Sequence, residues 1–344
     1  MSATLVELDG SKGEGGGQIL RSSLALSLLT GRPFHLRNVR ARRSKPGLQP
    51  QHLMSVRAAA TVGQAQTHGA SLHSKDLVFE PGAVVPSNYR FDIGTAGATS
   101  LVLHTLYLPL ALRSKEPSTL TLVGGTHVLA SPCFHFLQTT WRAHLQRMGL
   151  DIHLKMIRPG FYPRGGGVVE ATIQPCARLR PVDHGDRGRI SLSGFSAVAG
   201  LPEDIAYRQA RRAAQRLKTK RLHVDINIET WPGGPGTGIG IIVETEPVPV
   251  LFFGLGARGK PAERVADEAV DQLLAYLEAS QAGVDGHSAD QIVLPLALAD
   301  GSSSFQVAEV TSHLLTNIAV ISQFLNREIQ CHGEQGRPGE VRIV

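Results

Sequence analysis

The sequence predicts an α/β protein built from three similar layers, one of which is interrupted by a long insertion. Two observations carry this prediction. The pentapeptide LPLAL occurs twice, at 108–112 and 294–298, each time at the end of an apolar segment with helical character. Each copy is followed by a segment with the composition and alternation of a strand. The segment 15–31, near the start of the chain, shows the same helix-to-strand order.

Each layer contains a second predicted helix, and this helix is followed by strand-rich sequence with frequent glycines. In the first layer, the first helix, the strand and the second helix are expected at 15–31, 33–39 and 50–63. In the second layer they are expected at 94–112, 118–125 and 134–149. In the third layer they are expected at 287–298, 302–310 and 312–325. The first two layers are expected to span 1–92 and 93–180. Repeats of this kind predict open sheets with helices that cover one face.

The third layer is expected to be interrupted, because a segment of different character precedes its first helix. This segment contains predicted strands at 189–198, 222–230 and 238–254, a basic helix at 203–218 and a helix at 261–279. A long insertion adds little loop-closure entropy, so a folded host tolerates it. We therefore expect a large domain of residues 1–185 plus 281–344 and a smaller inserted α/β domain of residues 186–280.

The composition limits the class of protein. Of the 344 residues, 42% are hydrophobic and 19% are charged, and no apolar run reaches the roughly 18 residues of a membrane span. The start of the chain lacks the pattern of a secretory signal, and the three cysteines show no CxxC spacing. We expect a cytoplasmic protein with no membrane partner. A formal charge of +6 favours a polyanionic partner.

A cluster of glycines surrounds Glu14 and precedes Arg21 on the first predicted helix. Glycine lets a ligand come close to the main chain, at an entropic cost that a plain surface turn seldom needs several times over. The stretch 10–33 therefore predicts a binding site.

A basic run follows the first predicted strand, with Gln51 and His52 shortly after it. In an extended strand, Arg40 and Arg42 share one face, whereas Arg43 lies on the other face or turns into the loop. The planar guanidinium group suits phosphate oxygens, so this run predicts a phosphate site. The alternative is a solvated basic edge.

His313 lies in the first turn of the last predicted helix, off its apolar stripe, with Thr311 or Ser312 as the expected N-cap. The positive end of the helix dipole keeps an imidazole neutral and nucleophilic and also favours a nearby phosphate. The structural alternative is a packed or solvated histidine.

Three further candidates have structural alternatives of similar weight. The segment 287–291 opens a helix, where Ser288 is a candidate N-cap and Asp290 complements the helix dipole. His104, on the corresponding helix of the second layer, is either a core residue or part of a site. The GxGxxG match at 254–259 follows a strand, but the predicted helix begins only after the glycines, so it is a weak dinucleotide candidate. No P-loop sequence is present.

Taken together, the sequences EGGGQILR, RARRSKPGLQPQH, FYPRGGG, HSADQIVLPLAL and SHLLTNIAVISQFL closely resemble the RNA 3'-terminal phosphate cyclases over nearly the whole chain. The resemblance implies three βαβαββ units plus a smaller inserted domain. It also implies an ATP-dependent reaction that converts an RNA 3'-phosphate into a 2',3'-cyclic phosphate through a histidyl-AMP. A branch of the family without the histidine serves in ribosome assembly, and a non-catalytic RNA-binding factor of this kind is the alternative. The related enolpyruvyl transferases lack the insertion.

The resemblance also assigns roles to residues of this sequence. His313 resembles the adenylylated nucleophile and Glu14 a ligand of Mg²⁺ or Mn²⁺. The residues expected to bind the RNA end and the triphosphate are Arg21, Arg40, Arg43, Gln51 and His52. Those expected near the nucleotide are Gln18, His104, His287, Ser288, Ala289, Asp290 and Gln291. The family often has a tyrosine at the position of His287 and a glutamine at that of His104, which leaves the preference between ATP and other nucleotides open. Two further questions stay open: whether DNA 3'-phosphate ends are also accepted, and whether the protein forms oligomers.

Overall fold

The computed structural model describes residues 4–279 and 282–344, and it confirms the mixed α/β class. The helices are α1 (Gln18–Thr30), α2 (Pro50–Val62), α3 (Thr99–Arg113), α4 (Phe134–Phe136), the π-helix η1 (Leu137–Trp141), α5 (Arg142–Arg147), α6 (Asp204–Thr219), α7 (Ala262–Ala279), α8 (Gly286–Ala297) and α9 (Ser312–Phe324). The strands are β1 (Val6–Asp9), β2 (Phe34–Arg37), β3 (Gln66–His68), β4 (Leu77–Glu80), β5 (Asn88–Asp92), β6 (Ser118–Gly124), β7 (Ile152–Arg158), β8 (Gly167–Ile173), β9 (Asp183–His184), β10 (Ser191–Ala199), β11 (Val224–Trp231), β12 (Gly236–Glu244), β13 (Val250–Leu255), β14 (Ser303–Val307), β15 (Ile329–His332) and β16 (Gly339–Ile343).

Three of the four-stranded sheets share one arrangement. Their strand orders are β1-β2-β4-β3, β5-β6-β8-β7 and β9-β14-β16-β15. In each sheet the first two strands are parallel, and the other pairings are antiparallel. Along the chain, each sheet is assembled from strand, helix, strand, helix, strand and strand, if the insertion in the third is set aside. These three groups of elements are called unit 1, unit 2 and unit 3 below.

The boundary between the first two predicted layers was wrong. Strand β5 (Asn88–Asp92) already belongs to the sheet of unit 2, so unit 1 ends before it. Unit 3 begins with β9 (Asp183–His184), which pairs with β14 across the whole insertion. A two-residue strand carries no periodic signal, which is why the sequence did not reveal it. The boundary at 185/186 stays a prediction, and the one at 280/281 lies outside the described residues.

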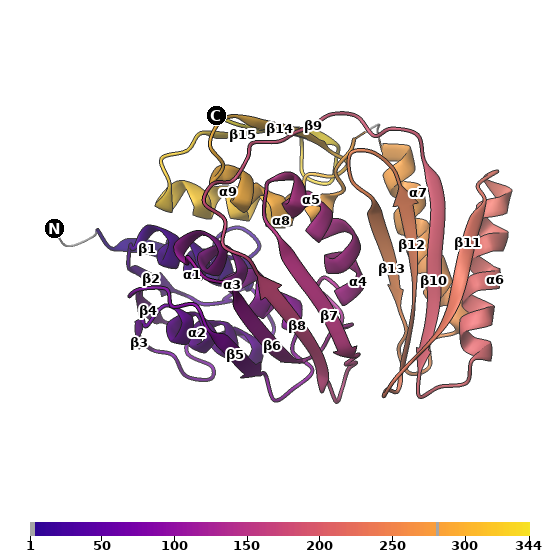
Figure 1. Ribbon diagram of the computed structural model, residues 1–344, viewed down its shortest axis with the longest axis horizontal. Helices are drawn as coiled ribbons and strands as arrows, with labels where there is room; N and C mark the ends of the chain where they lie inside the picture. The colour runs from indigo at the N-terminus through magenta and orange to yellow at the C-terminus, as the bar shows by residue number, and fades with distance from the viewer. Residues whose placement is uncertain (1–3, 280–281) are drawn as a thin grey trace.

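The helices of the three units form the interior. Almost every residue of α1 and most of α3 are buried, as expected of helices that are apolar on all sides. Helix α1 packs against α3 and α9, α2 against α3, and α8 against α9. The sheet of unit 3 lies above α8 and α9 in Figure 1. This packing brings the N-terminal ends of α1 and α9 together, although they lie at opposite ends of the chain.

The insertion forms a separate sheet at the right of Figure 1, with the strand order β11-β10-β12-β13. Ion pairs join its two helices, among them Arg208 with Glu263 and Arg212 with Asp267. Strand β13 packs against α4 and η1 of unit 2, and the Leu251 amide donates to the Thr140 hydroxyl at 2.9 Å. One end of the insertion is therefore fixed against unit 2.

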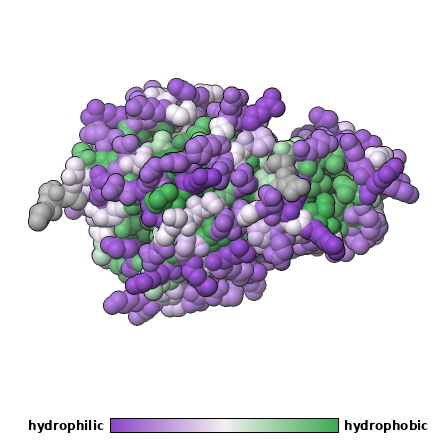
Figure 2. Space-filling model, turned by 90° about the horizontal axis from the view of Figure 1, so that it is seen from above, coloured by the Kyte–Doolittle hydropathy of each residue, from purple (hydrophilic) through white to green (hydrophobic). Residues whose placement is uncertain are grey.

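Within the described residues, no helix combines the length and the apolar character needed to cross a membrane. The face seen from above carries mainly hydrophilic side chains, with smaller apolar areas between them (Figure 2).

Candidate active site

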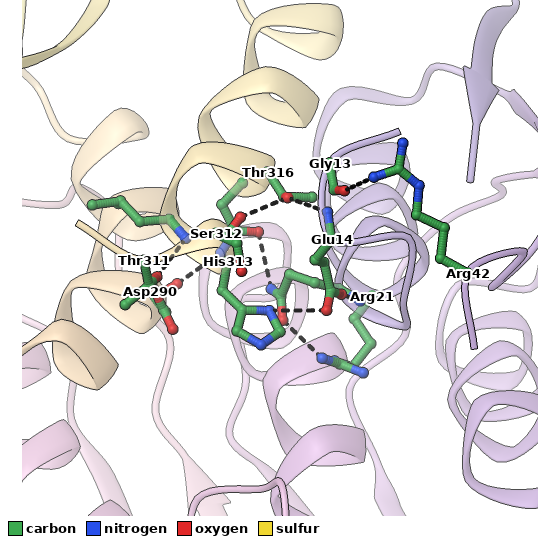
Figure 3. Close-up of polar contacts among 12 residues, drawn as sticks. Gly13, Glu14, Arg21, Arg42, Asp290, Thr311, Ser312, His313 and Thr316 are labelled. Carbon is green, nitrogen blue, oxygen red and sulfur yellow. Dashed lines mark hydrogen bonds and ion pairs between the residues drawn. The ribbon is translucent and has the colours of Figure 1, made fainter. Parts of the chain in front are cut away.

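The side chains of Glu14 and His313 face each other where the N-terminal ends of α1 and α9 meet (Figure 3). Nδ1 of His313 lies 3.3 Å from Oε2 of Glu14, whose side chain is only 4% exposed. The other carboxylate oxygen of Glu14 accepts the Gln18 amide at 3.0 Å, and the Thr316 hydroxyl accepts the Glu14 amide at 3.1 Å. The Glu14 carboxylate is therefore held between the two helix ends, where it complements their positive dipoles.

Burial lowers the pKa of His313, and the positive charges of Arg21 and Arg43 lower it further, whereas Glu14 opposes the shift. The ring is therefore neutral near pH 7. Because Nδ1 faces Glu14, Nε2 is the ring nitrogen that is available to a ligand. His313 is 42% exposed at its side chain, so it lies outside the apolar core, as its position off the apolar stripe predicted.

The position of His313 depends on the cap of α9. The hydroxyl of Thr311 accepts the Leu314 amide at 3.0 Å, which confirms Thr311 as the N-cap. The same hydroxyl donates to the buried carboxyl of Asp290 on α8. Burial raises the pKa of Asp290 well above its usual range, and the bond from Thr311 partly offsets this. Asp290 thus fixes the first turn of α9 through Thr311.

Replacement of Thr311 tests this coupling. Thr311→Val removes the cap and leaves the buried Asp290 carboxyl without its donor, so we expect a loss of about 1–2 kcal/mol of unfolding free energy. We also expect slower chemistry at His313, because the first turn of α9 then frays. The measurement is chemical denaturation together with an assay of the activity proposed below. Thr311→Ser keeps the hydroxyl, and a Ser variant as impaired as the Val variant would contradict the cap.

The glycines beside Glu14 make room for arginine side chains. A Cβ added at Gly16 would lie 2.6 Å from Nη2 of Arg43, and that guanidinium group donates to Glu14. Arg42 reaches the carbonyl oxygen of Gly13 at 3.1 Å, directed away from His313 (Figure 3). The glycine-rich loop therefore contacts the basic run directly. A ligand beside these glycines stays a prediction.

The basic run does not continue the strand as expected. Strand β2 ends at Arg37, and residues 38–45 form turns and bends. Asn38 and Arg40 have positive φ angles of 55°, which breaks the extended backbone. Arg40 and Arg42 therefore do not share one face of a strand. Arg40 turns back to donate to the carbonyl oxygens of Lys45 at 2.6 Å and Gly47 at 2.9 Å, which orders the loop.

Positive charge is concentrated beside Glu14. Arg21 is only 9% exposed, and none of the described carboxylates forms an ion pair with it. Burial lowers its pKa to about 10, opposed by Glu14 and assisted by Arg40 and Arg43. Burial and these three arginines lower the pKa of His52 to about 2. A buried guanidinium group that lacks a paired carboxylate favours an anion from solution.

Two glutamines link neighbouring helices at the site. The amide oxygen of Gln18 accepts from Arg21 at 2.7 Å, and its amide nitrogen donates to Asn317 of α9 at 2.9 Å. The amide oxygen of Gln51 accepts the backbone amide of Ala98, before α3, at 3.1 Å. Gln18 thus joins α1 to α9, and Gln51 joins α2 to the loop before α3.

A pocket of about 350 Å³ opens beside His313. Of the predicted site residues, it is lined by Gln18, Arg21, His287, Asp290, Gln291 and His313. Its other walls come from the loop 127–133 and from Leu251, Phe253, Leu255 and Gln272 of the insertion. These walls were missed by the sequence prediction, because apolar residues of a distant strand carry no local signal of a site. The size lies in the usual range for ligand pockets.

Three predicted nucleotide residues do not line this pocket. The Ser288 amide and hydroxyl both donate to Asp285, which is the N-cap of α8, so the alternative of Ser288 as the cap was wrong. Ala289 is fully buried beside it. The ring of His104 packs 5.2 Å from that of Trp141, and burial lowers its pKa to about 3. Whether any of them contacts a nucleotide stays a prediction.

The GxGxxG match at 254–259 lies at the end of β13, and helix α7 begins only at Ala262. β13 pairs antiparallel with β12, so the parallel βαβ setting of a dinucleotide site is absent from this part of the described structure.

Similarity to known proteins extends over nearly the whole chain. A family model described as RNA 3'-terminal phosphate cyclase matches residues 12–331. Curated proteins named RNA 3'-terminal phosphate cyclase include one from Caldivirga maquilingensis, 44% identical over 95% of this chain and 94% of its own length. Those from Ectopseudomonas mendocina and Ralstonia nicotianae are 44% and 45% identical, covering 96% and 97% of this chain and 96% and 95% of theirs.

One solved structure, an EPSP synthase from Acinetobacter baumannii, aligns with a TM-score of 0.30 and 11% identity over 99% of this chain and 64% of that one, too weakly to support an argument. The family model and the identities extend over nearly the whole sequence, and they include the segments that bring Glu14, Arg21 and His313 together. The chain belongs to the RNA 3'-terminal phosphate cyclase family.

Proposed function

We propose that this protein uses ATP to convert the 3'-phosphate end of an RNA into a 2',3'-cyclic phosphate, with His313 as the nucleophile. The observation that carries the proposal is the placement of a neutral His313 against Glu14 in the lining of a pocket, together with the guanidinium group of Arg21, with which none of the described carboxylates pairs. A nucleophile, an anion site and a ligand-sized pocket are thus adjacent. The family relationship supports the substrate class.

The first step is attack of Nε2 of His313 on the α-phosphorus of ATP. A nitrogen–phosphorus bond forms, the bond from that phosphorus to the bridging oxygen breaks, and pyrophosphate leaves. The ring gains positive charge in this step, and the Glu14 carboxylate 3.3 Å from Nδ1 stabilises it. The covalent intermediate divides one difficult reaction into easier steps.

The next two steps take place at the RNA end. An oxygen of the RNA 3'-phosphate attacks the same phosphorus and breaks its bond to His313, which forms an RNA-adenylate. The neighbouring 2'-hydroxyl then loses its proton and attacks the 3'-phosphorus, and AMP leaves. We expect Arg21 and Arg43 to bind the terminal phosphate, and Arg40, which donates to the carbonyl oxygens of Lys45 and Gly47, to support the loop that carries Arg43.

Glu14 is the residue that would hold a divalent cation when the substrate is bound. The described residues include no group of three or more His, Cys, Asp or Glu side chains that could hold a metal alone. Mg²⁺ commonly takes one or two carboxylates and completes its shell with phosphate oxygens and water, and Glu14 is such a carboxylate. Bound there, Mg²⁺ or Mn²⁺ would neutralise phosphate charge.

The proposal is tested by incubating the protein with α-³²P-ATP and Mg²⁺, followed by denaturing electrophoresis. We expect a labelled band that is stable to alkali and labile to acid, as a phosphoramidate is. Addition of an RNA with a 3'-phosphate should discharge the label and yield a cyclic end. A folded protein that binds RNA but takes no label would instead favour the non-catalytic RNA-binding alternative.

The pH dependence of labelling follows from the lowered pKa of His313. Protonation removes the lone pair of the nucleophile, so the rate falls as the pH drops through this pKa. Because burial lowers the pKa below the ordinary value of about 6.5, we expect an acid limb centred below pH 6.5. Single-turnover labelling rates between about pH 4.5 and 8 measure it. A limb centred above pH 7 would contradict a neutral, partly buried imidazole.

A further inference from the structure

The loop at 159–166, called the Tyr162 loop below, carries the first six residues of the FYPRGGG sequence (161–167), to which the proposed chemistry gives no role. It connects β7 to β8 at the lower edge of Figure 1. Tyr162 is 81% exposed, the most exposed large hydrophobic side chain among the described residues, and Arg164 is exposed two residues later. An exposed aromatic ring and an exposed guanidinium group thus lie on one turn.

The Tyr162 loop is held firmly beneath these two side chains. The Thr126 amide donates to the Gly160 carbonyl at 2.9 Å, and the Gly160 amide donates to the Thr126 hydroxyl at 2.9 Å. The Gly165 amide donates to the Phe161 carbonyl at 2.7 Å, and Arg158 donates to the Gly166 carbonyl at 2.6 Å. The exposed ring therefore stands on an ordered turn.

The anchors of the Tyr162 loop lead to the active site on two sides. The ring of Phe161 lies 5.5 Å from that of His127, which lines the pocket beside His313. On the other side, a Cβ at Gly165 would lie 2.6 Å from the Thr95 carbonyl oxygen, in the loop whose Ala98 amide donates to Gln51. The Tyr162 loop thus contacts His127, which lines the pocket, and Thr95, in the loop that is bonded to the predicted phosphate residue Gln51.

We propose that the Tyr162 loop is a docking platform for the single-stranded RNA upstream of its 3'-phosphate, with a base stacked on Tyr162 and a backbone phosphate on Arg164. The inference rests on the proposed function, because it places the terminal phosphate at Arg21 and Arg43. Unpaired bases stack on exposed aromatic rings with little regard to sequence, and arginine pairs with the phosphate backbone. The combination on one rigid turn suits an RNA end of any sequence.

Binding is measured directly by fluorescence anisotropy, with a 5'-labelled single strand of about ten nucleotides that ends in a 3'-phosphate. We expect Tyr162→Ala to weaken binding about 5- to 100-fold, and Tyr162→Trp to preserve it. Arg164→Ala should lower the slope of log affinity against log salt by about one ion. Tyr207→Ala and Arg211→Ala, at exposed positions of α6 far along the chain, are the matched controls and should change neither quantity.

The cyclisation assay separates the platform from the chemistry. Tyr162→Ala should raise KM for the longer strand, with kcat, self-labelling from ATP and KM for a dinucleotide 3'-phosphate unchanged. If the wild-type protein labels itself and Tyr162→Ala binds and cyclises the longer strand as the wild type does, the platform is wrong and the proposed function stands. If the wild-type protein neither labels itself nor cyclises an RNA end, the proposed function fails, and the anisotropy measurement still decides whether the platform binds RNA.

Discussion

His313→Ala should abolish formation of the labelled enzyme, with a loss of more than about 10³-fold in rate, because no other described side chain places an imidazole nitrogen against Glu14. The fold should persist. The His313 side chain is partly exposed, and the cap of α9 is made by Thr311, so the substitution removes no core packing. The measurement combines α-³²P-ATP labelling with a thermal unfolding curve of the same preparation.

The matched control is His332→Ala, at an exposed histidine on β15 of the same unit. This variant should label at the wild-type rate. Two results would contradict the role of His313: full labelling of the His313→Ala protein, or a loss of labelling that is accompanied by unfolding. If the His313→Ala protein is inactive and folded, an equilibrium binding assay then measures whether the pocket beside Glu14 and Arg21 still binds ATP.

Arg21→Met should separate activity from stability. Arg21 is buried, and none of the described carboxylates pairs with it, so the folded state bears the cost of keeping its charge out of water. A methionine of similar volume removes that cost, and we expect the unfolding free energy to stay equal or to rise by up to about 2 kcal/mol. Activity on a 3'-phosphate RNA should fall more than about 100-fold, because the anion site is lost.

The contrasting control is Arg327→Met. Arg327 donates to the carbonyl oxygens of Ala299 and Gly301, so its removal leaves backbone groups without a partner and should destabilise the protein while activity is retained. Chemical denaturation curves and turnover rates for both variants give the comparison. An Arg21→Met protein that is much less stable than the wild type, or that keeps its activity, would show that Arg21 serves the fold and not a phosphate.

Local chemistry explains which parts of the site could be predicted from the sequence. Thr311 as the N-cap and His313 in the first turn follow from side chains within a few residues of each other, and the structure confirms the cap. The apolar helices α1 and α3 were also predictable, because their hydrophobic character is visible within each segment. The prediction that Arg40 and Arg42 share one face of a strand was wrong, because the positive φ angles of Asn38 and Arg40 end the extended backbone there.

Other parts depend on contacts between distant segments. The pairing of β9 with β14 spans the whole insertion, and the pocket wall from β13 depends on its packing against η1, where the Leu251 amide meets Thr140. The sequence around β9 does not predict its pairing with β14, and the sequence around β13 does not predict its packing against η1. The distant meeting of Glu14 with His313 entered the sequence prediction only through the family resemblance, which supplied the roles but not the geometry.

The same meeting of the two chain ends has a consequence for synthesis of the protein. Glu14 is synthesised well before α9, which follows the insertion and nearly all of units 1 and 2. Until α9 docks on α1, His313, the proposed nucleophile, does not lie opposite the Glu14 carboxylate and the arginines beside it. If the proposed mechanism holds, a nascent or truncated chain without α9 lacks its nucleophile, and we expect labelling from ATP only after this last helix has docked.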